Sequence, residues 1–203
     1  RTATEQRLAL GAALTPARNY VQRLRRVAEV LLAEGAAAPP SPLRAGLRQA
    51  ATDAATGVVG GIYLDDIAGS PRAGRSGNLI GRPGLLDAAR PDPHEIDMAL
   101  ALMEQMWLGH ADTPYLRWSY YFSARADLTS FYPFTPSTEM IAGHGFTDLD
   151  AWFASWADFD ILRRAEPDVN PQRLAFWTPP YVDGYGAGWM VSRAAPVYDG
   201  DRF

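Results

Sequence analysis

The C-terminal stretch Phe176–Phe203 constrains the fold more than any other part of the chain. It reads FWTPPYVDGYGAGWMVSRAAPVYDGDRF, two extended segments joined by a Gly-rich turn. Because side chains alternate between the faces of a strand, residues two apart point the same way. Tyr181 and Asp183 are therefore expected to project together, with Trp177 beside them if the strand stays regular through its prolines. An aromatic face beside a carboxylate suits a small cationic or hydroxylated ligand. The alternative is an ordinary hairpin in which Asp183 caps the turn.

The composition excludes several classes of chemistry. The 203 residues include no cysteine, and all 19 basic residues are arginine. Thiol catalysis, thiolate zinc sites, iron–sulfur clusters, disulfides and the P-loop are therefore excluded. The net charge of −4 and the lack of a basic stripe argue against a nucleic-acid partner. No apolar run approaches the ~18 residues that a membrane helix needs, and no cofactor is predicted.

The N-terminal region is expected to be helical. Thr15 followed by Pro16 has the pattern of a helix start, and Gly35 with the prolines after it ends the helix. Between them small and apolar residues recur at spacings of four and three, which gives a heptad-like stripe. It forms either a dimerisation helix or a helix that packs on its own domain. The stripe consists of Ala17, Val21, Leu24, Ala28 and Leu31.

The rest of the chain alternates between helical and extended patterns, which predicts an α+β fold. Asp92 and Glu95 are expected to form a capping box at a helix start, and Asp148 to cap a later helix. Residues 69–90, rich in Gly, Pro and Arg, are predicted to be a loop. Helices are expected at 43–55, from Asp92 to about Gly109, after Asp148 and up to Arg164, and strands at 57–66, 115–124 and 128–134.

No motif singles out a catalytic centre. The three histidines, His94, His110 and His144, lack the spacing of a helical metal pair and are expected at the surface. No G-x-S-x-G elbow is present, and no carboxylate pair stands out as a glycosidase pair. The abundance of Trp and Tyr nevertheless keeps a secreted carbohydrate-active enzyme or binding module as an alternative. A purely structural dimerisation module is a second alternative.

The hairpin is also where the chain resembles a known family. The run W-T-x-P-Y-V-D, a Gly-rich turn and M-V-S-R-A-A-P-V-Y-D-G-D-x-F is similar to the end of the membrane-distal module of double Cache sensor domains. Asn170-Pro171, Tyr115–Phe134 and Leu64-Asp65-Asp66 fit the same pattern, so the resemblance spans most of the chain. These domains are the extracytoplasmic ligand-binding regions of bacterial histidine kinases, diguanylate cyclases and chemoreceptors.

The resemblance implies an architecture. A long helix, residues 1–56, would precede a PAS-like Cache module, residues 57–203, in which helices flank a central antiparallel sheet. Such sensors begin with a long helix along the module, which favours a dimerising, signalling helix, and Pro16 then predicts a kink or restart. The chain opens on Arg1 without an initiator methionine, and a double Cache region would continue into a second module and the membrane. We therefore expect an excised fragment, truncated at its C-terminus.

The resemblance also implies ligand-binding residues. In the Cache pattern the strand 116–122 forms the pocket floor, so Trp118 and Tyr120 become candidates, although core packing is an equal alternative. In amino-acid-binding members an upstream arginine holds the ligand carboxylate, while tyrosine and aspartate hold the amine. Tyr181 and Asp183 match, but the motif arginine is missing, and Arg163 or Arg164 would have to replace it. The full candidate set is Trp118, Tyr120, Tyr132, Arg163, Arg164, Trp177, Tyr181 and Asp183.

The sequence thus predicts a periplasmic sensor module of an inner-membrane receptor that performs no chemistry itself. Its partners would be a small polar ligand (an amine, amino acid or carboxylate) and a second copy bound through the N-terminal helix. A ligand would act by favouring one packing of the module over another. Asp183→Ala is expected to abolish ligand binding and to leave the fold intact.

Overall fold

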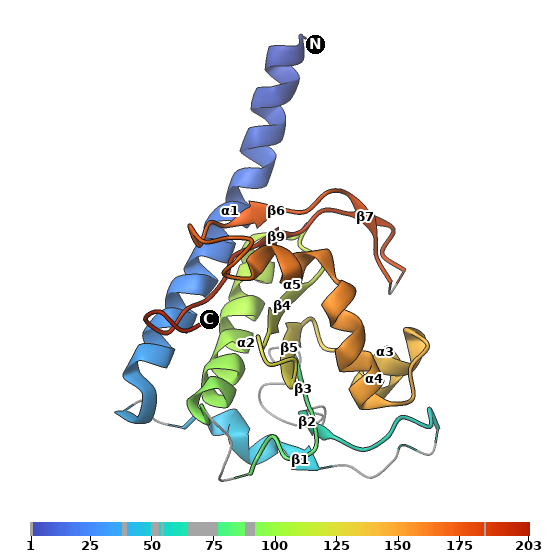
Figure 1. Ribbon diagram of the computed structural model, residues 1–203. Coiled ribbons are helices and arrows are strands. Elements are labelled where there is room, and N and C mark those ends of the chain that lie inside the picture. The colour runs from blue at the N-terminus through green and yellow to red at the C-terminus, as the bar shows by residue number, and fades with distance from the viewer. Residues whose placement is uncertain are drawn as a thin grey trace.

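The computed structural model has a mixed α/β fold with a long N-terminal helix and an antiparallel sheet (Figure 1). It describes residues 2–37, 40–49, 53, 55–64, 77–87, 92–184 and 186–203. Helices lie on both sides of the sheet, and the C-terminal hairpin crosses the edge of the body beside the long helix (Figure 1). Asp65 and Asp66 lie outside the described residues.

The long helix α1, Ala3–Glu34, begins and ends at well-defined caps. Thr2 and Glu5 form a capping box at its start, and Gly35 ends it with φ 51°. Pro16 lies inside the helix, so the prediction of a start or restart at Thr15 is wrong. The Thr15 hydroxyl does not cap the helix, because it donates back to the Gly11 carbonyl at 2.8 Å.

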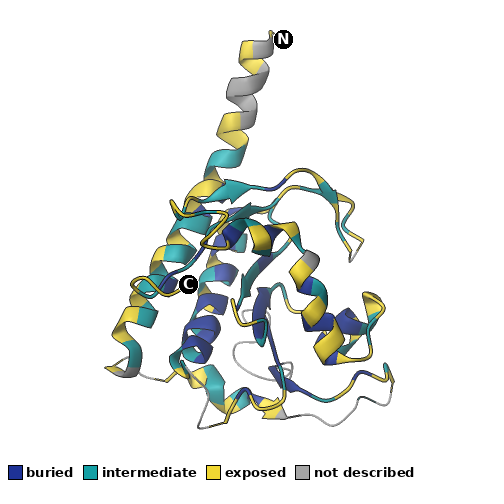
Figure 2. Ribbon diagram, in the orientation of Figure 1, coloured by how far each residue is buried: buried dark blue, intermediate teal, exposed yellow. Residues whose placement is uncertain are grey.

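The heptad-like stripe of α1 packs on its own domain. Ala17 and Ala28 are buried, and Leu24 and Leu31 pack against helix α2, His94–Asp112. This is the second of the two readings of the stripe. The N-terminal half of α1 extends beyond the body, and its described side chains before Leu14 are exposed (Figures 1 and 2).

The central sheet has five antiparallel strands in the order β1-β2-β3-β5-β4. Side chains of the central strand alternate between two cores: Leu79 points to the α2 side and Ile80 to the opposite side. Strand β4 lies at one edge, where only one neighbour pairs with it. The strands are β1 Arg48–Gln49, β2 Ile62–Leu64, β3 Asn78–Gly81, β4 Ser119–Phe122 and β5 Leu128–Tyr132.

Helices cover both faces of this sheet. On one face α2 buries Ile96, Leu100 and Met103 against the strands, and α1 packs on its outer side. On the other face Trp152 and Phe153 join a core of aromatic and aliphatic side chains, as the Asp148-capped helix predicts. Four short helices form this second layer and its margin: α3 Ser137–Gly143, α4 Leu149–Ala154, the 3₁₀ helix η3 Ser155–Asp158 and α5 Asp160–Ala165.

Two predicted elements are wrong. Residues 69–90 were expected to form a loop, yet β3 is the fully buried centre of the sheet. Its sequence, NLIG, is too short to show a period, and burial on both faces decides its structure. The helix expected at 43–55 is instead a 3₁₀ helix, η2 Pro42–Gly46, followed by β1, because residues 48 and 49 pair with β2. Helix α3 was not predicted.

Boundaries of other elements shift for physical reasons. The predicted strand 57–66 is reduced to β2 within its described part, and 115–124 and 128–134 are reduced to β4 and β5. At the start of α2 the capping box is absent: Pro93 is the N-cap residue and makes no side-chain cap bond. The two acids have other partners, since Glu95 pairs with Arg125 and Asp92 pairs with Arg125 and Arg202.

The C-terminal segment folds as the expected hairpin of extended segments. Its base is β6, Phe176–Trp177, paired with β9, Arg193–Ala194, and its outer part is β7, Tyr181–Val182, paired with β8, Trp189–Met190. After β9 the chain returns along α1 (Figure 1). No described helix is long and apolar enough to span a membrane.

The close contact of α1 with α2 depends on a glycine, Gly109, which has no side chain. Tyr20 is buried against Gly109, and a Cβ atom at Gly109 would lie 2.1 Å from Cε2 of the Tyr20 ring. Since the nearest backbone of α2 has no side chain there, the tyrosine can lie flat against the helix.

We expect Gly109→Ala to lower the free energy of unfolding by about 1–2 kcal/mol, because overpacking outweighs the helix propensity gained. Urea denaturation of the variant and of Gly11→Ala measures this. Gly11 is also helical but has no atoms within 4 Å of its Cβ position, so its substitution should cause no loss. In a Tyr20→Ala background the loss at Gly109 should disappear; a loss of the same size there would contradict the contact.

Candidate ligand cavity

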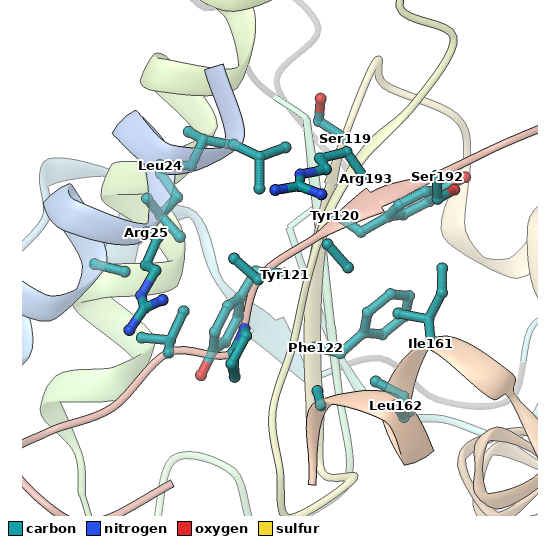
Figure 3. A pocket seen from close by; sticks show the side chains of 18 of the residues that line it. Leu24, Arg25, Ser119, Tyr120, Tyr121, Phe122, Ile161, Leu162, Ser192 and Arg193 are labelled. Carbon is teal, nitrogen blue, oxygen red and sulfur yellow. The ribbon is translucent and has the colours of Figure 1, made fainter. Parts of the chain in front are cut away.

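A cavity of about 930 Å³ runs along the edge strand β4. Helix α1 forms one wall, η3 and α5 form the opposite wall, and residues 187–203 cover the strand (Figures 1 and 3). All four residues of β4 line it, together with Trp118 just before the strand. A volume near the upper end of the ~300–1,000 Å³ typical of ligand pockets is large enough for a small organic molecule.

Apolar and aromatic side chains form most of the walls. Figure 3 shows Leu24 on the α1 side, Phe122 and Tyr120 on β4, and Ile161 and Leu162 on the α5 side. The faces of β4 divide as the alternation predicts, since Tyr120 and Phe122 pack toward α4 and Tyr121 packs toward α2. Tyr120 thus both lines the cavity and packs against the core.

A buried hydrogen-bond chain lies at the α1 end of the cavity. The Tyr20 hydroxyl donates to Ser119 Oγ at 2.7 Å, and Ser119 Oγ lies 3.0 Å from His110 Nε2. The serine hydroxyl has one proton and a second lone pair, so it can bond to Nε2 in either tautomer of the imidazole. Burial raises the pKa of Tyr20 to about 12 and lowers the pKa of His110 to about 4. The chain joins α1, β4 and α2 through uncharged groups.

Arg193 is a partly buried basic residue of the cavity wall. It lies in β9 opposite Trp177, and its guanidinium is 5.5 Å from the Trp177 ring centroid. From β9 the side chain extends toward α1 (Figure 3). Its Nε is buried without a hydrogen-bond partner. Burial, followed by the positive charge of Arg18, lowers the pKa of Arg193.

Three of the predicted site residues line the cavity: Trp118, Tyr120 and Trp177. The Trp118 ring lies under the Arg117 guanidinium, 5.0 Å from centroid to Cζ. Burial raises the pKa of Tyr120, and the neighbouring Tyr181 and Asp183 raise it further. These last two residues therefore lie close to the cavity, behind Tyr120.

Tyr181 and Asp183 do not line the cavity themselves. The Tyr181 hydroxyl is bonded to Ser192 Oγ at 2.6 Å, and Ser192 is the residue that lines the wall. Asp183 accepts from the Ala187 backbone N–H at 2.9 Å, and its own N–H donates to the Gly188 carbonyl. Asp183 thus caps the Gly-rich turn, which is the alternative that the sequence left open.

The remaining candidates lie elsewhere. Arg163 is exposed, and Arg164 pairs with Asp160 one helical turn away, so neither arginine reaches the cavity. Tyr132 packs on the α2 side of the sheet, with its ring 4.9 Å from that of His110. His110 itself lies within α2 and is half-buried, so the expectation that it lies at the surface is wrong.

Sequence reasoning missed Tyr20, Ser119, His110 and Arg193. None of them carried a usable sequence signal: counting pairs outward from Tyr181 and Met190 would bring Ala194 opposite Trp177, and a one-residue shift in register places Arg193 there instead. Comparison with family models, with curated proteins and with solved structures found no match. In the described part of the chain no three His, Asp or Glu side chains group in a way that could hold a metal ion.

The low pKa of His110 predicts a pH-dependent stability. Between pH 6.5 and about 4 the unfolded histidine binds a proton that the folded one does not, so its contribution to stability is present above pH 6.5 and is lost as the pH falls through this window. We expect His110→Gln to flatten this part of the curve of unfolding free energy against pH, measured by urea denaturation.

His144→Gln, which removes an exposed histidine from the same chain, is the matched control for His110→Gln. If His110→Gln follows the wild-type curve at every pH, the folded imidazole is not held neutral by burial.

Proposed function

We propose that this chain is the ligand-sensing module of a membrane-bound signalling receptor, of the double Cache type that its hairpin motif resembles. The ligand would be a small polar molecule held in the cavity beside β4, on the extracytoplasmic side of the membrane. The mixed α/β fold with its antiparallel sheet and long first helix is compatible with a PAS-like Cache module.

One observation supports this proposal above the others: the proposed signalling element, helix α1, is itself a wall of the cavity. Helix α1 contributes Ala17, Tyr20, Val21, Leu24 and Ala28 to the lining. The facing wall belongs to η3, α5 and the C-terminal segment. A molecule between these walls contacts the helix that leaves the body, so its binding free energy depends on where that helix lies.

Binding then acts by population shift. A ligand that fits one packing of α1 against α2 and β4 better than another stabilises that packing by its difference in affinity. The Tyr20–Ser119–His110 chain offers a discrete element for this shift, because Ser119 both lines the cavity and bonds to the helix. A ligand that takes a hydrogen bond from Ser119 would weaken its bond to His110.

The acidic groups of the cavity favour binding over hydrolysis. Glycoside hydrolysis needs two carboxylates that converge on a substrate, whereas Asp92 and Glu95 both pair with Arg125. Asp199 pairs with Arg202. The Ser119–His110 pair has the spacing of a nucleophile and its base, but the serine oxygen also accepts a bond from Tyr20. A structural module without a ligand would have no use for so large a cavity.

A variant that fills the cavity tests its role. Ala195 lines the cavity, and Ala195→Trp should abolish the rise in melting temperature that small amines, amino acids or carboxylates produce in the wild type. Ala111→Trp is the control, since Ala111 is exposed on α2 away from the cavity. A compound that stabilises Ala195→Trp as much as wild type binds elsewhere, and the cavity is then not the sensor site.

The proposed dimer can be tested through the absence of cysteine. Because the chain has none, Ala12→Cys on the exposed part of α1 introduces a single thiol. If two copies pair through this part of the helix, mild oxidation should give a disulfide-linked dimer on a non-reducing gel at micromolar protein. Ala111→Cys is the control for random collision. Equal, slow cross-linking of both variants would contradict a dimer through α1.

A further inference from the structure

The side chain of Arg193 has no partner that would neutralise its charge. Among the residues that the structure describes, none makes an ion pair or hydrogen bond with its guanidinium, and Nε is shielded from solvent. A buried donor without an acceptor is costly, and in Arg193 this cost falls on Nε, since the residue as a whole is partly buried. A ligand that supplies an acceptor would satisfy this donor and add a counter-charge.

Other arginines at the cavity are already engaged. Arg25 bonds to Glu29 and to the Arg173 carbonyl, Arg125 pairs with Glu95, and Arg202 pairs with Asp92 and Asp199. Arg117 is exposed and lies over Trp118. Arg193 is the lining arginine that makes no side-chain hydrogen bond or ion pair with a described residue and whose Nε is also shielded from solvent.

The surroundings of Arg193 select an anion with an apolar body. The positive charge of Arg18 acts on Arg193. Two positive charges near each other favour the binding of a negative group. The Trp177 ring supports one face of the guanidinium. Beyond it lie Tyr120, Phe122 and Leu162, which offer a hydrocarbon or aromatic surface (Figure 3).

We propose that the ligand of this cavity is an organic carboxylate, with its acid group bound by the Arg193 guanidinium and its apolar part between β4 and α5. A guanidinium presents two parallel N–H donors that match a carboxylate, which gives both affinity and orientation. This inference rests on the proposed function, since it names the chemical class of the ligand. It replaces Arg163 and Arg164 as the candidate anchor.

The test compares carboxylates with their uncharged amides, which have nearly the same shape. The probes are acetate and acetamide, phenylacetate and phenylacetamide, and indole-3-acetate and indole-3-acetamide, with inorganic phosphate as a further arm. Calorimetric titration of the whole chain should show at least one carboxylate binding about tenfold more tightly than its amide. Phenylacetate or indole-3-acetate should bind more tightly than acetate.

Variants assign the preference to one residue. Arg193→Gln should remove the difference between acid and amide, and Arg193→Lys should keep only part of it, because a single ammonium cannot form the paired bonds. Arg163→Gln is the matched control, exposed and outside the cavity, and should bind like wild type. The comparison of acid with amide in the wild type needs no variant, so it decides even if Arg193→Gln does not fold.

Each contrary result has its own meaning. Equal binding of acid and amide by the wild type, a preference that survives in Arg193→Gln, or tighter binding of phosphate than of any carboxylate would overturn the carboxylate inference. If one of these results is obtained, but another compound raises the melting temperature of the wild type and not that of Ala195→Trp, the cavity remains the proposed sensor site and its ligand belongs to a different chemical class. If no compound stabilises the wild type, the proposed function fails first.

Discussion

The contact of Tyr20 with α2 and β4 determines where the cavity can exist. Its ring lies on Gly109, where α2 has no side chain, and its hydroxyl bonds to Ser119. Together these two contacts hold α1 close to α2 at Gly109 and beside the edge strand at Ser119. Since β4 has a neighbour on one side only, the other side is open to whatever lies between it and α1.

The C-terminal segment covers part of this open edge and leaves a half-open cavity. Arg202 binds Asp92 at the start of α2, and the β6–β9 pair lies beside α1. The segment therefore contacts both helices while it crosses β4. Polar groups line the resulting cavity at several places, among them Ser119, Arg193 opposite Trp177, and the ion pairs of Arg125. Polar groups set among apolar walls can orient a bound molecule.

The sequence predicted those parts of the fold that local patterns specify. Asp148 caps its helix, the aromatic side of α4 is buried, and the last segment forms a hairpin, because capping, periodicity and turn residues act over a few positions. Strand β3 and the strand after η2 were missed since their structure is decided by pairing with distant partners. Of the predicted site residues, Trp118, Tyr120 and Trp177 line the cavity. Tyr181 and Asp183 do not line it, because their polar groups bond within the hairpin, to Ser192 and to the backbone of the turn.

Helix α1 also has the mechanical properties of a lever. Thr2 lies about 27 Å from Tyr20 at the ordinary rise of an α-helix, so a tilt of a few degrees about Tyr20 displaces the tip by about 2 Å. Pro16 lies just before the buried Ala17, and its missing N–H leaves the Ala12 carbonyl without its helical partner. Helix α1 is thus most easily bent near Pro16, where it extends beyond the rest of the domain. The stiffness of the helix turn at Pro16 therefore determines how much of a movement of α1 at the cavity is transmitted to the N-terminal part of the helix.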